Sequence, residues 1–221
     1  MTQLIDSIAE IAGQFDAIVL DQWGVLHDGS APYPTAQDAL RMLADCPAKI
    51  AVLSNSGKRA APNAVRISGM GFDTGTFDCV MTSGEALWHA FANEPAMPKT
   101  LFPIVGHAGD ADVWAAGLSI SMTSSIAAAA AILLMGLPDC AVLDAWDQTL
   151  RAAQGRALPL YCSNPDFTSP RGGGQYVVSP GAVAQRYRDM GGAVHLYGKP
   201  HHPIFAAVEA ALDCCPDRIL M

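Results

Sequence analysis

The chain has 221 residues, of which 51% are hydrophobic and 15% are charged, and 21 acidic against 13 basic residues give a formal net charge of −8. This composition excludes a disordered chain and is that of a protein with a sizeable core, in one large domain or two small ones. The acidic balance argues against nonspecific binding to nucleic acid or to an anionic membrane. It still allows a phosphorylated substrate, because a local cation or metal reverses the field in a cleft.

Neither the cysteines nor the N-terminus suggests secretion. The six cysteines form no CxxC pair, and residues 1–6 lack the basic and then apolar pattern of a signal peptide. The longest apolar stretch, 126–137, has 12 residues, fewer than the roughly 20 that span a bilayer. We therefore expect a cytoplasmic protein with reduced thiols and no membrane segment.

In the first half of the chain, segments with the apolar spacing of helices alternate with short apolar runs that are typical of buried strands. The expected elements, in order, are a helix over 3–13, a strand over 17–22, a helix over 36–45 with Thr35 as its N-cap, a strand over 49–53, a helix with Pro62 in its first turn that ends near 69–71, a strand over 79–81 and a helix over 84–91. Such alternation is typical of a parallel sheet with right-handed crossovers.

The composition changes at 93–98, where two prolines in six residues are typical of a link into a second unit. Beyond this link we expect strands over 101–105, 130–135, 158–162 and 194–197, helices over 181–190 and 203–212, and the start of a strand at 218–221. The sequence therefore predicts a separate lobe from about 93 to 192.

A carboxylate ends the first strand, in the segment AIVLDQWG over 17–24. Because ligands of open α/β sheets bind beyond the carboxyl ends of the strands, Asp21 is expected at the mouth of a crevice. There it can bind a metal, or attack phosphorus and form an aspartyl-phosphate. The alternative is an ordinary aspartate that accepts hydrogen bonds from the following turn, and this segment alone favours neither.

Polar residues also follow two later strands. Ser54 and Asn55 follow the second strand, and Lys199 follows the strand over 194–197. Since parallel strands end on one edge of a sheet, we expect Asp21, Ser54 and Lys199 to meet in one pocket. The Ser54 hydroxyl and nearby backbone N–H groups can hold a phosphoryl oxygen, and Lys199 can neutralise charge between a carboxylate and a phosphate. The alternatives are a helix cap or turn for Ser54 and a solvated lysine in a turn.

Three further features are weaker. By itself, Asn164-Pro165-Asp166 is typical of an Asx-Pro turn. His201 and His202 have no further ligands at metal-binding spacing, so a place at the surface or on the rim of a cleft is expected. The cysteines are expected to pack in the interior.

Five segments, in this order, resemble the haloacid dehalogenase-like (HAD) superfamily, class IIA, which contains sugar-phosphate, p-nitrophenyl phosphate and pyridoxal phosphate phosphatases. They are LDQWGVL (20–26), VLSNS (52–56), TSG (82–84), LYCSNPD (160–166) and YGKP (197–200). Their order and spacing agree with the family over essentially the whole chain. The resemblance implies an α/β fold with a Rossmann-like parallel-sheet core at 1–92 and 193–221 and an inserted α/β cap domain at 93–192.

The resemblance also implies roles for residues of the core. Asp21 would be the nucleophile and a ligand of Mg²⁺, and the backbone carbonyl of Trp23 would be a second metal ligand. Ser54 and Asn55 would bind the transferred phosphoryl group, and Lys199 would hold the nucleophile and the phosphate in place.

In the cap, the resemblance implies that Asn164 and Asp166 contact the substrate. The partner would be a small phosphorylated metabolite chosen by the cap, without nucleic acid or membrane, and a homodimer is compatible with caps of this class. The implied activity is that of a magnesium-dependent phosphatase with an aspartyl-phosphate intermediate.

The sequence departs from the family pattern at Trp23, where the usual phosphatase has a second aspartate as general acid and base. An indole cannot transfer a proton, and loss of such help typically costs about two to four orders of magnitude in rate. His27 and Asp28 are candidates to replace it, although their spacing does not prove this.

A second departure is at 218–221, which is similar to the start of the strand that carries the family's fourth, acidic motif, and the sequence stops there, so either the sequence is truncated or the protein lacks this motif. Without those acids the expected magnesium site has one carboxylate, Asp21, and one carbonyl. Two alternatives to the phosphatase therefore stay open. One is a non-catalytic HAD-fold protein that binds a phosphorylated ligand or a protein partner, and the other is HAD chemistry different from ester hydrolysis.

Overall fold

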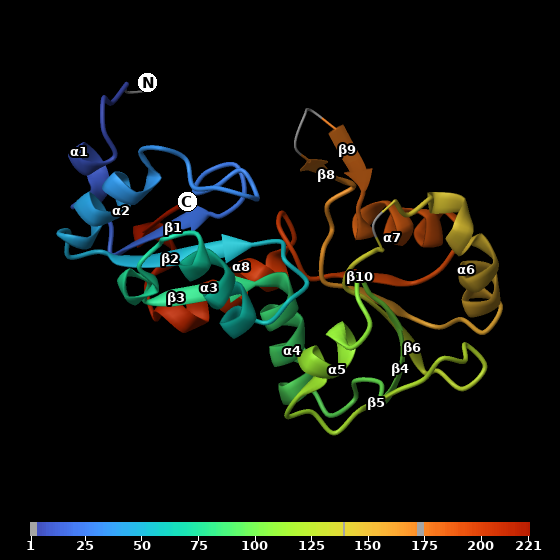
Figure 1. Cartoon of the computed structure of the whole chain (residues 1–221). Coiled ribbons are helices and arrows are strands. Elements are labelled where there is room, and N and C mark those ends of the chain that lie inside the picture. Colours follow the sequence, from blue (N-terminus) through green and yellow to red (C-terminus); the bar gives the residue numbers. More distant parts are fainter. Residues whose placement is uncertain (1–3, 139, 172–174) are drawn as a thin grey trace. The chain divides into compact units, whose positions relative to one another are not determined.

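The computed structural model describes residues 4–138, 140–171 and 175–221, and the chain forms two compact units (Figure 1). Unit 1 comprises Met1–Ser54, Ala60–Met81 and Phe205–Met221, and unit 2 comprises Asn55–Arg59 and Thr82–Ile204. Each unit is built on its own parallel sheet, so the expected α/β class with parallel sheets is confirmed. No helix of the described residues is long and apolar enough to cross a membrane.

The sheet of unit 1 has the strand order β11-β1-β2-β3. Its strands are β1 (Ala17–Asp21), β2 (Lys49–Ser54), β3 (Cys79–Thr82, whose last residue is grouped with unit 2) and β11 (Ile219–Leu220). Its helices are α1 (Ala9–Ala12), α2 (Ala36–Ala44) and α3 (Ala60–Gly69), with short 3₁₀ turns at Thr74–Thr76 and Pro216–Arg218. Apolar side chains of β1 and β2 pack against α2 and α3 in one core cluster that includes Ile18, Ile50, Val52, Leu40, Leu43 and Ile67.

Local hydrogen bonds explain where helix α1 begins, but not where α2 begins. The helix expected over 3–13 is a single turn, because the Glu10 carboxylate accepts hydrogen bonds from the backbone N–H groups of Asp6 and Ser7 and caps the chain there; residue 3 lies outside the described residues. Helix α2 begins after Thr35 as expected, yet the Thr35 side chain makes no capping hydrogen bond.

The five-stranded sheet of unit 2 has the order β10-β7-β6-β4-β5, with all neighbours parallel. The strands are β4 (Thr100–Ile104), β5 (Ser121–Met122), β6 (Ala131–Leu134), β7 (Leu160–Cys162) and β10 (Val194–Leu196). All four residues of the central strand β6 are buried, which is why the sequence there is a continuous apolar run. Ile132 and Leu134 pack on one face of the sheet, while Ala131 and Leu133 pack on the other.

Helices cover both faces of this second sheet. Helices α4 (Ser83–Asn93) and α5 (Asp110–Ala115) supply Phe91 and Trp114 to one face. Helices α6 (Asp147–Gln154) and α7 (Pro180–Asp189) supply Leu150 and Tyr187 to the other, with a 3₁₀ turn at Leu143–Trp146 before α6. Unit 2 is therefore a three-layer α/β/α body.

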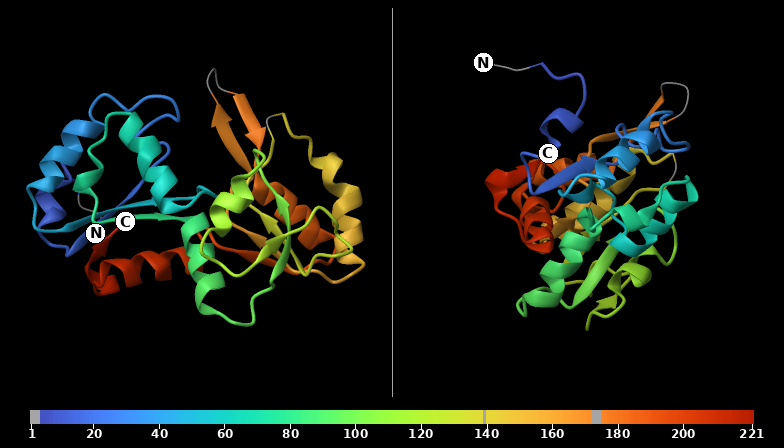
Figure 2. Two further views of the ribbon diagram at one scale, coloured as in Figure 1. Left: turned by 60° about the horizontal axis from the view of Figure 1, so that its bottom comes forward. Right: turned by 90° about the vertical axis from the view of Figure 1, so that its left-hand side faces the viewer.

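An antiparallel hairpin, β8 (Thr168–Arg171) and β9 (Gln175–Val178), projects from unit 2 in every view (Figure 2). Helix α8 (His202–Leu212) starts in unit 2 and ends in unit 1. The hairpin and helices α5 and α6 were not expected from the sequence.

The strands expected at 17–22 and 101–105 belong to different sheets, as a separate lobe requires. The two compact units differ from the expected division, because unit 2 also contains Asn55–Arg59, α4 and the segment 193–204. The division into 1–92, 93–192 and 193–221 stays a prediction of where the cap is inserted.

Candidate active site

Asp21 stands at the carboxyl end of β1, where its side chain is exposed and its Oδ1 accepts a hydrogen bond of 2.7 Å from the backbone N–H of Gln22. Parallel pairing places Asp21 opposite Leu53 on β2, so the next residue on β2, Ser54, lies at the same edge of the sheet. Ser54 is only 8% exposed. The structure thus brings two of the expected site residues to one end of the unit 1 sheet.

After Asp21 in the chain, a network of buried polar side chains holds the loop that leaves β1 in place. Gln22, His27 and Asn63 are almost completely buried, which is rare for polar side chains unless they bond to one another. The Gln22 amide lies 3.0 Å from Nε2 of His27 and 2.6 Å from the Asn63 amide on α3. The loop is closed further by the hydrogen bond from Gly24 N–H to the His27 carbonyl, 2.9 Å, at a glycine whose φ of +91° disfavours other residues.

The surroundings of His27 favour the neutral ring. Burial lowers its pKa, and the nearby Arg66 lowers it further. Its Nδ1 accepts a hydrogen bond of 2.9 Å from Gly29 N–H, so a neutral ring carries its proton on Nε2. Both ring nitrogens are used inside the protein, so His27 is unsuited to exchange protons with a substrate.

The Trp23 side chain packs against its own loop. Its ring centroid lies 5.9 Å from that of His27, and the Arg66 guanidinium lies 5.4 Å above the indole. Gly29 fits beneath it, since a Cβ there would lie 2.4 Å from the ring. Asp28 closes the same loop through hydrogen bonds of 2.8 Å from Ser30 and Ala31 N–H, and these lower its pKa, which makes it a poor proton donor near neutral pH.

In unit 2, the side chain of Asn55 joins three segments of the chain. Its Oδ1 accepts from Lys199 N–H at 2.7 Å, and its Nδ2 donates to the Lys199 carbonyl at 3.1 Å and to Oδ1 of Asp166 at 2.7 Å. The Ser83 hydroxyl donates to the same Oδ1 at 3.2 Å. The structure therefore brings Asn55, Asp166 and Lys199 together, and the Asn55 amide acts as their scaffold, so any phosphate contact of Asn55 would use its backbone.

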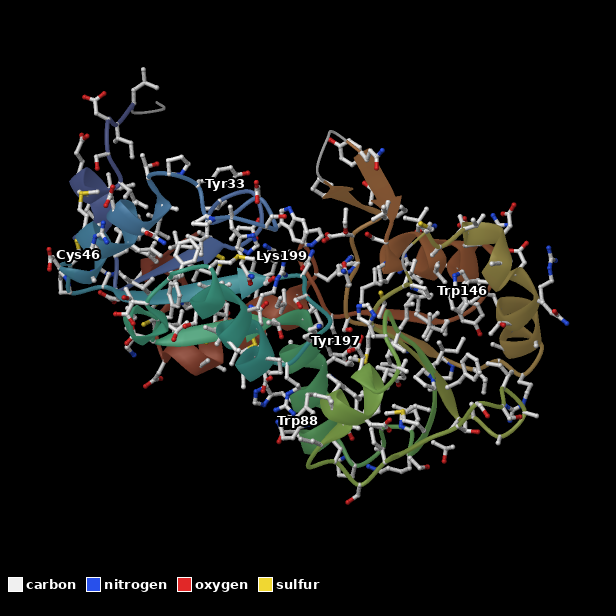
Figure 3. The ribbon with its side chains drawn as sticks, viewed as in Figure 1. Tyr33, Cys46, Trp88, Trp146, Tyr197 and Lys199 are labelled. Carbon is white, nitrogen blue, oxygen red and sulfur yellow. The ribbon has the colours of Figure 1, made fainter. Side chains whose placement is uncertain are left out.

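A glycine, Gly198, and a turn that begins at Asn164 permit this junction. A Cβ at Gly198 would lie 2.3 Å from Cδ of Pro165 and 2.7 Å from Oδ1 of Asn55, so only glycine fits there. Asn164 accepts a hydrogen bond of 3.1 Å from Asp166 N–H, which is the Asx turn that the sequence suggested. Tyr197 and Lys199 lie in the segment that follows β10 (Figure 3). This segment contacts the turn at Asn164.

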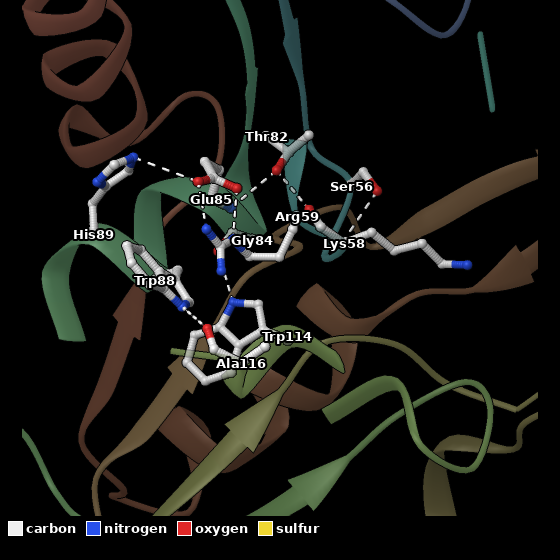
Figure 4. Close-up of polar contacts among 10 residues, drawn as sticks. All are labelled: Ser56, Lys58, Arg59, Thr82, Gly84, Glu85, Trp88, His89, Trp114 and Ala116. Atoms are coloured by element: carbon white, nitrogen blue, oxygen red, sulfur yellow. Dashed lines mark hydrogen bonds and ion pairs between the residues drawn. The ribbon is translucent and has the colours of Figure 1, made fainter. Parts of the chain in front are cut away.

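The loop that carries Asn55 is clamped to the start of α4 (Figure 4). Arg59 makes a bidentate ion pair with Glu85, at 2.7 and 2.9 Å, and its guanidinium lies 3.9 Å from the Trp88 ring centre. Thr82 caps α4 by accepting from Glu85 N–H and donates its hydroxyl to the Lys58 carbonyl at 2.6 Å. This clamp fixes the backbone on which Asn55 stands.

A pocket of about 460 Å³ opens beside this junction and is lined entirely by unit 2. Its polar lining includes Asp166, Arg188, Lys199 and His201. His201 is half-buried and the next residue, His202, is exposed, in keeping with the expected position on a rim. No group of three or more His, Cys, Asp or Glu side chains that could hold a metal occurs among residues 4–138, 140–171 and 175–221.

Cys162 is buried and Cys46, Cys79 and Cys214 are half-buried, whereas Cys140 and Cys215 are exposed, so the expected packing in the interior is wrong for these two. All six are free thiols, and burial raises the pKa of the Cys162 thiol to about 12.

Comparisons with known proteins agree with this architecture. Residues 18–119 match the family model of the haloacid dehalogenase-like hydrolases. The chain is similar to a haloacid dehalogenase-like hydrolase from Brucella suis, at 27% identity and a TM-score of 0.87 over 98% of this chain and 80% of that one. It is 24% identical to chronophin of Homo sapiens over 97% of this chain and 76% of that protein. Its fold also resembles that of a glycerol phosphate phosphatase from Mycobacterium tuberculosis in complex with magnesium, with 21% identity, a TM-score of 0.71, and 92% of this chain and 60% of that one covered.

These similarities confirm the resemblance to the haloacid dehalogenase-like hydrolases of class IIA. The residues that sequence reasoning overlooked are those that position the site: Asn63, whose amide is buried on α3, and Gln22, which holds the loop after Asp21. An asparagine on the inward side of α3 was the available signal, because a buried amide needs a polar partner.

Proposed function

We propose that this HAD-family phosphatase hydrolyses the phosphate monoester of a small metabolite with the help of Mg²⁺, and that Asp21 is its nucleophile. The observation that carries the proposal is the exposed Asp21 carboxylate at the end of β1, next to the buried Ser54 on the neighbouring parallel strand. Nucleophilic aspartates form acyl-phosphates when a phosphorus atom is presented in line.

The proposed reaction has two steps. A carboxylate oxygen of Asp21 bonds to phosphorus as the bond to the ester oxygen breaks, and the alcohol leaves with a proton. Water then attacks the aspartyl-phosphate, which releases inorganic phosphate and restores the carboxylate. The Ser54 hydroxyl would donate to a phosphoryl oxygen, and Lys199 would neutralise charge between nucleophile and phosphate.

The residues present fit Mg²⁺ in its usual manner in phosphoryl transfer, with one or two carboxylates and the rest of the shell from phosphate and water. Asp21 would supply the carboxylate and Trp23 a backbone carbonyl. Backbone hydrogen bonds within the loop hold the residues on either side of Trp23 in place, through the Gln22 carbonyl and the Gly24 N–H. When bound, the cation neutralises the charge that develops on the transferring phosphoryl group.

Asp166 and Asn164 would serve the leaving group in different ways. Asp166 lines the pocket of unit 2, so its carboxylate can accept a hydrogen bond from a substrate hydroxyl. Asn164 would act by holding the turn on which Asp166 stands. The magnesium-bound glycerol phosphate phosphatase that shares this fold supports a small phosphorylated metabolite as the substrate class.

The test is magnesium-dependent release of phosphate from a panel of esters, from aryl phosphates to sugar and polyol phosphates. We expect turnover with Mg²⁺ and none in EDTA. Trp23 supports a second candidate, a non-catalytic protein that binds a phosphorylated ligand, because no proton donor stands at that position. Calorimetric binding of an ester without any turnover would favour this second candidate.

A further inference from the structure

Helix α3 holds the loop after β1 at two points. Asn63 and Arg66 are three positions apart on this helix, so they are neighbours on its surface. The Asn63 amide lies 2.6 Å from that of Gln22, where the loop begins. Nη2 of Arg66 donates a hydrogen bond of 3.0 Å to the carbonyl of Gly29, further along the loop. The segment from Gln22 to Gly29, which includes Trp23, is therefore tied to one helix at both ends.

Arg66 also acts on the side chain of Trp23. Its guanidinium lies 5.4 Å from the centre of the indole, within the range of a cation–π attraction. A planar guanidinium can stack on a ring and donate hydrogen bonds from its edge at the same time. The same ring lies against Gly29, because a Cβ there would be 2.4 Å from it. Arg66 thus holds both the indole and the backbone on which the indole rests, and this restrains the main chain of Trp23.

We propose that Arg66 is a positioning residue for the divalent cation, because it keeps the carbonyl of Trp23 in place as a ligand. The inference rests on the proposed phosphatase function, in which the chain supplies one carboxylate, from Asp21, and this carbonyl. These residues and helix α3 all belong to unit 1. A site with few protein ligands depends on their fixed positions, and loss of a group that orients a ligand typically weakens metal binding by about 10- to 100-fold.

Charge and positioning predict opposite effects of removing Arg66. A guanidinium near the site repels a cation, so charge alone would make binding tighter when the arginine is lost. Positioning makes binding weaker, because the loop then loses the hydrogen bond to Gly29 and the contact with the indole. Arg66 is exposed and lies outside the core cluster of unit 1, so its replacement leaves the fold intact.

The test measures the binding of Mn²⁺, as a substitute for Mg²⁺, to the full chain by the electron paramagnetic resonance of the free ion. We expect Arg66→Gln to raise the dissociation constant about tenfold, and Arg66→Lys, which keeps a charge above the indole, to raise it less. Arg41→Gln is the matched control and should bind as the wild type does, because Arg41 is exposed on α2 and pairs with Asp38 of the same helix. Asp21→Asn should remove most of the binding, which shows that the proposed site is the one measured.

Kinetics with p-nitrophenyl phosphate separate positioning from a loss of structure. In Arg66→Gln the Mg²⁺ concentration for the half-maximal rate should rise about tenfold, while kcat at saturating Mg²⁺ stays near that of the wild type. A partly unfolded variant would instead lose kcat and keep the Mg²⁺ requirement.

Unchanged or tighter Mn²⁺ binding in Arg66→Gln, or a fall in its kcat alone, overturns the inference and leaves the proposed phosphatase intact. If the wild type binds no Mn²⁺, or if Asp21→Asn binds it as tightly as the wild type, the proposed metal site itself fails, and the inference fails with it.

Discussion

Trp23 is a packing residue at a position where a proton donor would help catalysis. Its indole contacts Gly29, His27 and Arg66, and it has one N–H donor with no useful pKa. His27 is sealed in the interior, and Asp28 is held as a carboxylate by backbone N–H groups. In the proposed reaction the leaving alcohol therefore takes its proton from water, which favours esters with good leaving groups.

We predict that Trp23→Asp raises the turnover of alkyl phosphates by at least about tenfold. A well-placed proton donor contributes a factor of ~10² to 10⁴ to the rate. Trp23→Asn is the matched control, because it removes the same packing and cannot transfer a proton. Trp23→Phe should change activity little. Steady-state rates with an alkyl and an aryl phosphate measure this, and equal rates for the Asp and Asn variants would contradict the assignment.

The lowered pKa of the buried His27 makes stability depend on pH. Its pKa is lower in the folded than in the unfolded state, where it is about 6.5, so the unfolded chain binds the proton first. The contribution of His27 to the free energy of unfolding is fully present above pH 6.5. It is lost as the pH falls from there toward the lower pKa of the folded state. The carboxyl groups with lowered pKa values, Asp16, Asp28 and Asp147, titrate below this window.

We expect the free energy of unfolding in urea to fall between pH 6.5 and 5 with a slope of up to about 1.4 kcal/mol per pH unit from this residue. His27→Gln should remove that part of the slope, although it lowers stability at neutral pH. The exposed His202 serves as a control, and His202→Gln should keep the slope. An unchanged slope in His27→Gln would show that folding does not shift the pKa of this ring.

The sequence was sufficient to place Asp21 and Ser54, because each polar residue directly follows an apolar strand run and parallel strands end together. It was insufficient for the side chain of Asn55, which holds Lys199 and Asp166, more than a hundred positions away in the chain, while the expected phosphate contact of Asn55 stays a prediction. Such long-range hydrogen bonds do not produce a periodic pattern in the sequence. The expected convergence of Asp21 with Lys199 stays a prediction.

Among the elements, α7 positions the turn that carries Asp166. At Gly181, in its first turn, the backbone N–H donates to the Asp166 carbonyl at 2.9 Å, and a Cβ there would lie 2.0 Å from the Pro165 carbonyl oxygen. The helix and the turn can approach this closely only with glycine at the contact.

Gly181→Ala should therefore push α7 away from the turn and destabilise the protein by about 1 to 3 kcal/mol, as overpacking does. Gly155→Ala is the control, because a Cβ at that position would meet its nearest atom at 3.5 Å. Urea unfolding monitored by circular dichroism measures both variants. Equal midpoints for the two would refute the close contact.

The sequence correctly predicts the elements that contain strong apolar runs. It does not predict the elements that have few residues facing the core. Strands β1, β2, β6 and β7 are continuous apolar runs. Helix α6 buries only Leu150 and Ala153, and β9 of the hairpin has no fully buried residue, so neither has a periodic apolar signal of useful length.

For the molecule as a whole, two parallel sheets and the family match identify a HAD-like hydrolase, while the chemistry depends on a few side chains at strand ends. Fold alone does not decide function. The proposed function therefore depends on whether the carboxylate of Asp21 is the group that attacks phosphorus.

The most direct measurement is the rate of phosphate release from p-nitrophenyl phosphate with Mg²⁺ by the wild type, Asp21→Asn and Asp28→Asn. An amide is not a nucleophile toward phosphorus, so Asp21→Asn should lose at least about 10³ of the rate while its unfolding midpoint stays near that of the wild type. Asp28→Asn removes an exposed carboxylate of the same loop and keeps the capping oxygen, so it should retain the wild-type rate. Turnover by Asp21→Asn at the wild-type rate would contradict the account.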